Sequence, residues 1–241
     1  MAITKVTNEL LEIGILADAT NFTDSILISQ NASTGTLSSA TDNVGIGDDV
    51  FASLTSGRNS VAIGSNALDA NTSGKNNVAV GHDALGANTT ADSNTAVGKS
   101  ALEANTTGNL NVAIGTLALD ANTVGDRSVA VGYSALGSQN PASNADMNNT
   151  AVGYNAGGGL TTGIKNTLIG SVAGDAITTA DNNTAVGFSA LTANTTGASN
   201  TAIGKDSLAA NTTASNNIAV GLGALKDNTT GATNTAIGSE A

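Results

Sequence analysis

Residues that could do chemistry are few in this chain, and they are not grouped as catalysis requires. His82 is the only histidine, and there is no cysteine. Asp83 follows His82, but nucleophilic catalysis needs a nucleophile, a base and an orienting group within hydrogen-bond reach, and no such set is clustered along the sequence. We therefore expect His82 to lie at the surface, and we expect no catalytic residue, no cofactor and no metal site.

Short motifs in this sequence favour turns over ligand binding. Asn-Thr-Thr and Asn-Thr-Ser triplets, which match the acceptor of N-linked glycosylation, begin at Asn71, Asn88, Asn105 and Asn194. Asn, Thr and Gly in one cluster are also typical of turns, and the N-terminus has no apolar signal core. We interpret the triplets as turns. The glycines do not form a phosphate loop, and aspartate does not recur as it does in calcium-binding β-rolls.

Aromatic residues are the best candidates for contact with a receptor. Tyr133, Tyr154 and Phe188 each follow a glycine that ends a repeated motif, at a position whose residue type varies freely between copies. Such variation indicates exposure, and exposed rings in a row can stack on sugars or fill a subunit contact. Pro141, the only proline, lies in an insertion that we expect to protrude. These four residues are the candidate receptor or glycan contacts.

A repeat with a period of seventeen must position these side chains. A Val-Gly or Ile-Gly pair recurs, and eleven steps separate its glycines, ten of seventeen and one of twenty-one. The motif glycines are Gly47, Gly64, Gly81, Gly98, Gly115, Gly132, Gly153, Gly170, Gly187, Gly204, Gly221 and Gly238. A fixed short period indicates one structural unit stacked on copies of itself.

The residues before each motif glycine predict a short strand. The first residue before it is Val or Ile and the third is Val, Ile or Thr, while the second and fourth are mostly Ala and Asn. Alternation places Val, Ile and Thr on one face and Asn, Ala and Gly on the other. We expect the β-branched face to be the core. We expect the small, uncharged face to be buried against a neighbouring chain, which predicts a homotrimer.

The rest of each repeat supplies a corner, a leucine and a turn. Leucines such as Leu68, Leu85 and Leu102 recur at the fourth position after the motif glycine, and a single turn cannot bury them alone. The sequence therefore predicts an all-β fold, a parallel β-solenoid with one rung per seventeen-residue repeat and about twelve rungs. Asn43, Asn77, Asn94 and Asn111 should form a ladder of amide hydrogen bonds.

Two segments depart from the repeat. Residues 138–148 carry extra residues that should form a loop at a corner of the rod. Residues 1–42 match the repeat poorly and are expected to be a cap or an attachment segment, in which Ser25-Ile26-Leu27-Ile28 forms a degenerate first rung before residues 43–241. Ala241 lies in mid-rung, so we expect another domain, a partner protein or a second copy stacked end to end to cover the last rung.

Composition excludes several partners. The chain has 241 residues, a formal net charge of −11 and aromatic residues at only 2%. Nucleic-acid binding would need a basic surface, and no apolar run is long enough to cross a membrane. We therefore expect neither nucleic-acid binding nor membrane insertion. The acids are scattered, which is typical of a solvated surface.

Two resemblances bear on function. The motif Asn59-Ser60-Val61-Ala62-Ile63-Gly64 resembles the head repeat of trimeric autotransporter adhesins (the YadA-like head), which implies a left-handed β-roll of three chains over residues 43–241. Here the repeat is longer than the usual adhesin unit. The opening Met1-Ala2-Ile3-Thr4-Lys5-Val6-Thr7, followed by Leu10-Leu11, is similar to that of tail-fibre proteins of marine and cyanobacterial phages.

Together these resemblances imply a trimeric virion fibre that contributes to host attachment. Its partners would be two further copies of the chain, other virion proteins at the N- or C-terminus, and a host surface glycan or receptor. The alternative is the head of a bacterial surface adhesin. A third hypothesis is an ice-binding solenoid, because Thr pairs recur at a fixed spacing, for example Thr89-Thr90 and Thr106-Thr107.

Overall fold

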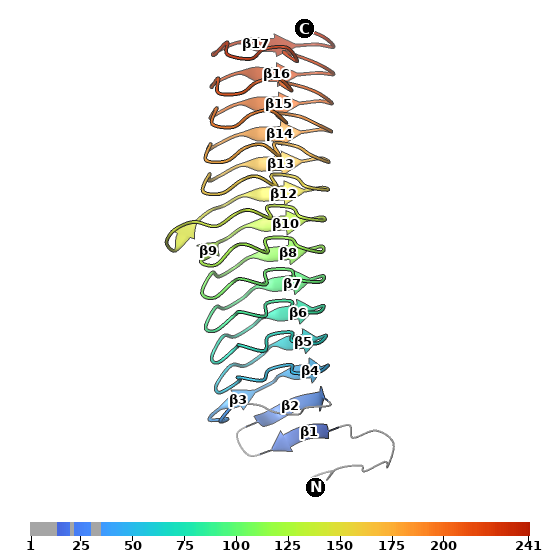
Figure 1. Ribbon diagram of the computed structural model, residues 1–241, viewed down its shortest axis with the longest axis vertical. Helices are drawn as coiled ribbons and strands as arrows, with labels where there is room; N and C mark the ends of the chain where they lie inside the picture. Colours follow the sequence, from blue (N-terminus) through green and yellow to red (C-terminus); the bar gives the residue numbers. More distant parts are fainter. Residues whose placement is uncertain (1–13, 20–21, 30–34) are drawn as a thin grey trace.

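The chain forms a rod of stacked rungs, each of which contains one short strand (Figure 1). The computed structural model describes residues 14–19, 22–29 and 35–241. The twelve strands that carry the repeat are β4 (Val44–Ile46), β5 (Val61–Ile63), β6 (Val78–Val80), β7 (Thr95–Val97), β8 (Val112–Ile114), β10 (Val129–Val131), β12 (Thr150–Val152), β13 (Thr167–Ile169), β14 (Thr184–Val186), β15 (Thr201–Ile203), β16 (Ile218–Val220) and β17 (Thr235–Ile237).

Neighbouring rungs pair in parallel and in the register that the repeat predicts. Val80 lies opposite Val97, and Val97 lies opposite Ile114. The predicted all-β parallel solenoid, with one rung for each seventeen-residue repeat, is therefore confirmed. The strands are only three residues long, shorter than the alternating pattern suggests, because the chain bends at the motif glycine and at the residue two before each strand, as at Ser93 and Leu110, which have positive φ.

The N-terminal end of the sheet is a hairpin. Strands β1 (Gly14–Ala19) and β2 (Phe22–Ser29) pair antiparallel, and β2 also pairs in parallel with β3 (Ala40–Thr41) and β4. Ile26 lies opposite Val44 and Ile28 opposite Ile46, an offset one longer than the repeat period. The predicted cap or attachment segment, residues 1–42, lies partly outside the described residues, and its role stays a prediction.

The insertion leaves the rod at a corner, so the strands on either side of it keep their register. Val129 of β10 lies opposite Thr150 of β12, so the longer step of the repeat is absorbed outside the strands. The additional residues project sideways in the segment that carries β11 (Ala145–Asp146), which pairs in parallel with β9 (Gly125–Asp126) (Figure 1). A short second sheet thus anchors the loop to the rung before it.

The corners of each rung depend on residues in the left-handed backbone region. In the rung of Gly98, Ser100, Leu102 and Leu110 have φ angles of 55°, 51° and 61°. Non-glycine residues adopt this region rarely, and leucine has no local hydrogen bond to favour it. Stacking compensates for this cost, since the amide of Leu102 donates to the carbonyl of Ala118 in the next rung at 3.0 Å.

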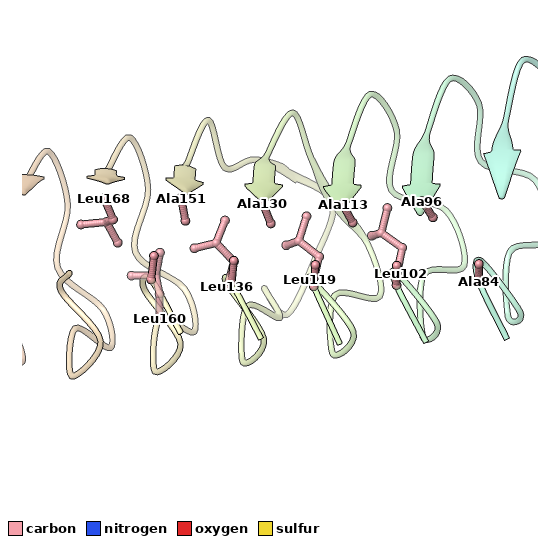
Figure 2. Close-up of a cluster of buried hydrophobic side chains, with 14 of the residues drawn as sticks. Ala84, Ala96, Leu102, Ala113, Leu119, Ala130, Leu136, Ala151, Leu160 and Leu168 are labelled. Carbon is pink, nitrogen blue, oxygen red and sulfur yellow. The ribbon is translucent and has the colours of Figure 1, made fainter. Parts of the chain in front are cut away.

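The two faces of the strands are oriented opposite to the prediction. The Ala row (Ala62, Ala79, Ala96, Ala113 and their equivalents) is fully buried up to Ala219, and Ala236 in the last rung is partly exposed, whereas none of the Val, Ile and Thr side chains beside the row is buried. Figure 2 shows why: Ala96, Ala113 and Ala130 point from the strands toward Leu102, Leu119 and Leu136 on the opposite wall. The leucines fill the narrow interior, so only small side chains fit on the strand wall. The expected contact of the Ala face with a neighbouring chain is therefore wrong.

Two consecutive rungs have glycine in place of the inner leucine, and the second of them has a leucine on its strand wall. Gly157 and Gly174 stand where the leucine row is expected, and Leu168 replaces the strand alanine. A Cβ atom at Gly157 would lie 2.6 Å from Cδ1 of Leu168, and one at Gly174 would lie 2.8 Å from its Cδ2. Leu168 therefore fills, from the strand wall, part of the space that leucines fill from the other wall elsewhere (Figure 2). Leu136 Cδ2 shares this space at Gly157, 3.0 Å from the same kind of Cβ position, and Ile177 Cδ1 shares it at Gly174, at 2.8 Å.

Two buried asparagine rows bind successive rungs together. In the row before the strands, Asn94 Oδ1 accepts from the amide of Asn111 at 2.9 Å, and Asn94 Nδ2 donates to the carbonyl of Gly108 at 2.8 Å. These bonds run mainly from side chain to backbone, so the expected amide ladder is not the main feature here. The amide-to-amide line lies in the second row, where Asn88 Nδ2 donates to Asn71 Oδ1 at 2.9 Å.

Candidate functional site

The most extensive surface feature is the outward face of the strands, here called the strand stripe. It consists of the first and the third residue before each motif glycine, which are Val, Ile or Thr in all twelve copies. Ile46, Ile114 and Ile203 are 42%, 40% and 40% exposed. The stripe carries no charged residue and runs the length of the repeat, so it is an uncharged surface, apolar except for the threonine hydroxyl groups in half of the rungs.

The three aromatic residues that are predicted to contact a receptor lie in a second row, here called the aromatic row. The row consists of the residues that directly follow the motif glycines from Gly132 to Gly221, which are Tyr133, Tyr154, Ser171, Phe188, Lys205 and Leu222. The rings of Tyr133 and Tyr154 are stacked, with centroids 5.5 Å apart and planes 11° from parallel. Tyr154 and Phe188 are 59% and 52% exposed. Phe188 lies two rungs beyond Tyr154, because β12, β13 and β14 are consecutive strands of the sheet.

Pro141 does not belong with these aromatics. It is buried, although its insertion projects from the rod. Its Cγ would lie 3.1 Å from a Cβ atom at Gly125 in the preceding rung, so the proline ring packs against that backbone. Pro141 therefore packs inside the loop and, unlike the three aromatic residues, presents no exposed side chain to a receptor in this structure.

Leu222 extends the aromatic row and is missing from the predicted contacts. It is 49% exposed and lies two rungs beyond Phe188, with Lys205 between them. Its place in the repeat is the signal that identifies it, since it follows a motif glycine as the tyrosines do. The apolar part of the row therefore alternates with Ser171 and Lys205 toward the C-terminal end.

An acidic groove runs along another corner of the rod. Asn66, Asp69, Asp83, Glu103 and Asp120 line it. Burial raises the pKa of Asp69 and that of Asp120 above the usual 3.8, and backbone hydrogen bonds partly oppose this effect. The negative charges of Asp83 and Asp49 also raise the pKa of Asp69, and the charge of Glu103 raises that of Asp120. Asn66 Nδ2 donates to Asp83 Oδ1 at 2.9 Å, so part of this acidic surface is occupied by contacts between rungs.

His82 lies at the surface and pairs only with Asp83. Its Nδ1 is 2.5 Å from Asp83 Oδ2, and its side chain is 53% exposed. Within residues 35–241 and the described strands β1 and β2, no three His, Cys, Asp or Glu side chains are grouped so that they could hold a metal ion. Among the residues that the structure describes, no helix has the length and hydropathy of a membrane span.

The Asn-Thr-Thr triplets serve the stacking of rungs. Asn71, Asn88 and Asn105 are fully buried, so their side chains are not accessible to a modifying enzyme. The first threonine after each of them uses its hydroxyl group within the rod: Thr89 Oγ1 donates to the carbonyl of Thr106 at 3.2 Å. Only the second threonine, such as Thr90, is exposed. The interpretation of the triplets as turns agrees with this geometry.

Comparison of this chain with models of protein families, with curated proteins and with solved structures gave no match. The site must therefore be interpreted from its own geometry, which consists of one long uncharged stripe, one row of exposed rings and one acidic groove on a regular rod.

Proposed function

We propose that this chain is the rod of a phage virion fibre, assembled as a homotrimer of left-handed solenoids and contributing to host attachment. The observation that carries the proposal is the strand stripe, which exposes Val, Ile and Thr without one charge over twelve rungs. Other virion proteins would hold the rod at one of its ends. In this role the protein acts by display and binding and has no enzymatic activity.

The absence of charge along the whole strand stripe, more than its size, supports burial against another molecule. Rungs about 4.8 Å apart make a stripe about 55 Å long, and with side chains it is about 10 Å wide. The resulting footprint, roughly 500 Å², is at the upper end of what monomers expose as one apolar patch. A single-sided stripe of this kind is typical of a subunit interface.

A second copy of the same chain is the partner that fits this stripe best. A copy that runs alongside in parallel presents apolar residues over the same length and at the same spacing. Its one longer step also falls at the same level, so the projecting loops do not interrupt the contact. Three copies, related by an axis along the rod, would bury the stripe as the resemblance to adhesin heads implies.

The assembly can be tested with one charge on the strand stripe. Ile114→Lys adds a charge at a position that is already 40% exposed, so the rung should keep its fold. We expect a trimer for the native protein by light scattering at micromolar concentration, and dissociation for the variant with unchanged far-ultraviolet circular dichroism. Thr107→Lys, on the exposed turn row, is the matched control and should remain trimeric.

A native protein that is monomeric under these conditions would contradict the proposal, as would a trimer that tolerates Ile114→Lys. The place of the rod on a virion needs a separate measurement. We expect antibodies against the chain to label purified phage particles in electron microscopy. Labelling of bacterial outer membranes instead would favour the adhesin head.

The ice-binding hypothesis has less support from this geometry. One threonine of each pair donates its hydroxyl group to the next rung, which leaves a single exposed Thr row on the turns. Measurement of thermal hysteresis at millimolar protein tests the hypothesis directly, and we expect none.

A further inference from the structure

We propose that Tyr154, Ser171 and Phe188 form a slot that binds one pyranose ring of a glycan. The proposal rests on the proposed function only for the source of that glycan, the host surface. The three residues occupy the same position in three consecutive rungs, and the middle one is small. A gap between two rings thus lies on the outside of the rod.

Rung spacing sets the width of the slot. Val152, Ile169 and Val186, each two positions before a member of the slot, lie directly opposite one another in the sheet. Two rung spacings therefore separate the backbones of Tyr154 and Phe188, which is about 10 Å. The stacked tyrosines show the ring orientation that this row supports, since their planes are 11° from parallel and their centroids are about one rung spacing apart.

This width favours a sugar over a flat aromatic ring. A flat ring held between two faces at van der Waals contact needs about 7 Å, so it would be loose in a gap of about 10 Å. A pyranose chair is thicker, because axial hydrogens project from both of its sides. Its C–H groups suit the negative faces of aromatic rings, and its equatorial hydroxyl groups would point to solvent and toward Ser171.

The free face of Tyr154 is the surface on which the sugar would stack. One face of this ring is covered by Tyr133, and the side chain is nonetheless 59% exposed. Tyr133 therefore holds the Tyr154 ring in place, which lowers the entropy cost of binding. Thr116, on the far side of Tyr133, has no aromatic residue beyond it in the next rung, so the row provides no equivalent slot there.

Tyrosine fluorescence reports on this slot alone. The chain has two tyrosines and no tryptophan, and both tyrosines lie in the stacked pair. We would titrate the native assembly with cellohexaose, and with the methyl β-glycosides of glucose, galactose and N-acetylglucosamine. We expect a saturable fluorescence change at millimolar concentration for at least one probe, and saturation transfer in NMR to the hydrogens on the faces of its ring.

Filling the gap is the sharpest perturbation. Ser171→Phe would complete a continuous aromatic stack without removing either of the two rings that enclose the sugar, so we expect a folded protein whose affinity falls at least about tenfold. Phe188→Ala should weaken binding as well. Thr116→Phe adds the same ring on the other side of Tyr133 and should bind the glycoside as the native protein does.

Three results would overturn the slot: no probe binds the native assembly, Ser171→Phe binds as tightly as the native protein, or acrylamide fails to quench the tyrosines because the assembly covers them. Light scattering of the same samples separates this proposal from the preceding one. A trimer without glycoside binding refutes the slot alone. A monomer that binds glycosides refutes the trimeric rod and supports the slot.

Discussion

Leu168 and the two glycines that face it should show strong energetic coupling. Leu168→Ala removes a fully buried side chain that lies against both Gly157 and Gly174, and neither glycine has a side chain to replace it. Leu→Ala substitutions in cores cost about 2.7–5.0 kcal/mol, and more where the cavity cannot collapse. With backbone hydrogen bonds holding the rungs apart, we expect a loss of about 4 kcal/mol.

The reverse substitution tests the same space. Gly157→Leu in the native background places a Cβ atom 2.6 Å from Leu168 Cδ1, so we expect overpacking to cost about 1–3 kcal/mol. The backbone itself should accept leucine, since φ at Gly157 is 59° and the leucines at the equivalent positions Leu136 and Leu191 have 51° and 55°. The double variant, Leu168→Ala with Gly157→Leu, restores the ordinary pattern in one rung and should recover about half of the loss or more.

Urea unfolding followed by circular dichroism measures the free energy of unfolding of the native protein, the two single variants and the double variant. Hydrogen exchange of amides in β12 and β13 measures the same loss of stability locally. The coupling should favour the double variant by at least about 2 kcal/mol. If the double variant is no more stable than Leu168→Ala alone, then Leu168 does not fill part of the space of the missing leucines, and our account of these two rungs fails.

Two further predictions concern the backbone and the acidic groove. Gly98→Ala should destabilise the rod by about 3 kcal/mol or more, because φ is 135° and a Cβ atom would lie 2.6 Å from the carbonyl carbon of Gly115. Thermal melts measure this loss. Gly86→Ala is the control and should be nearly neutral, because the nearest atom to its added Cβ would lie 3.4 Å away. For Asp120, burial raises the pKa above 3.8, so the folded state binds more protons than the unfolded state between 3.8 and the raised value. Stability should therefore rise as the pH falls through that window, and Asp120→Asn should weaken this dependence and stabilise the rod at pH 7 in urea titrations; a steeper dependence in Asp120→Asn would contradict this.

The stacking of the rungs was predictable, because the constant spacing of the repeat determines which residues of neighbouring strands pair. The positions of Val80, Val97 and Ile114 over one another follow from the seventeen-residue period alone, and so does the exit of the insertion at a corner. Hydrogen bonding between parallel strands requires a constant offset, and only residues outside the strands can absorb a different one.

The direction of the strand faces was not predictable from alternation, because period two defines two faces and does not say which is inside. β-Branched residues usually indicate the core, which made the wrong orientation the natural choice. What decides it is Leu102 and its equivalents, which come from the opposite wall and leave room only for Ala96 and Ala113. The positive φ angles of the leucines could not be predicted for a related reason. The local preference of leucine disfavours this backbone conformation, whereas hydrogen bonds between the stacked rungs stabilise it.

The candidate site was predicted in part for similar reasons. Exposure of Tyr133, Tyr154 and Phe188 follows from variation between copies, whereas burial of Pro141 depends on how its loop folds back on Gly125. A loop outside the repeat has no neighbouring copy from which its packing can be inferred.

The constant offset between rungs also has a genetic consequence. Duplication or loss of seventeen codons anywhere in the repeat would lengthen or shorten the rod by one rung, about 4.8 Å, and leave every Asn, Ala and Leu in register with its neighbours. A change that is not a multiple of seventeen would move the asparagines out of register with those of the neighbouring rung, unless the additional residues leave at a corner as residues 138–148 do. We therefore expect natural variants of this chain to differ in length by multiples of seventeen, with other insertions confined to the corners.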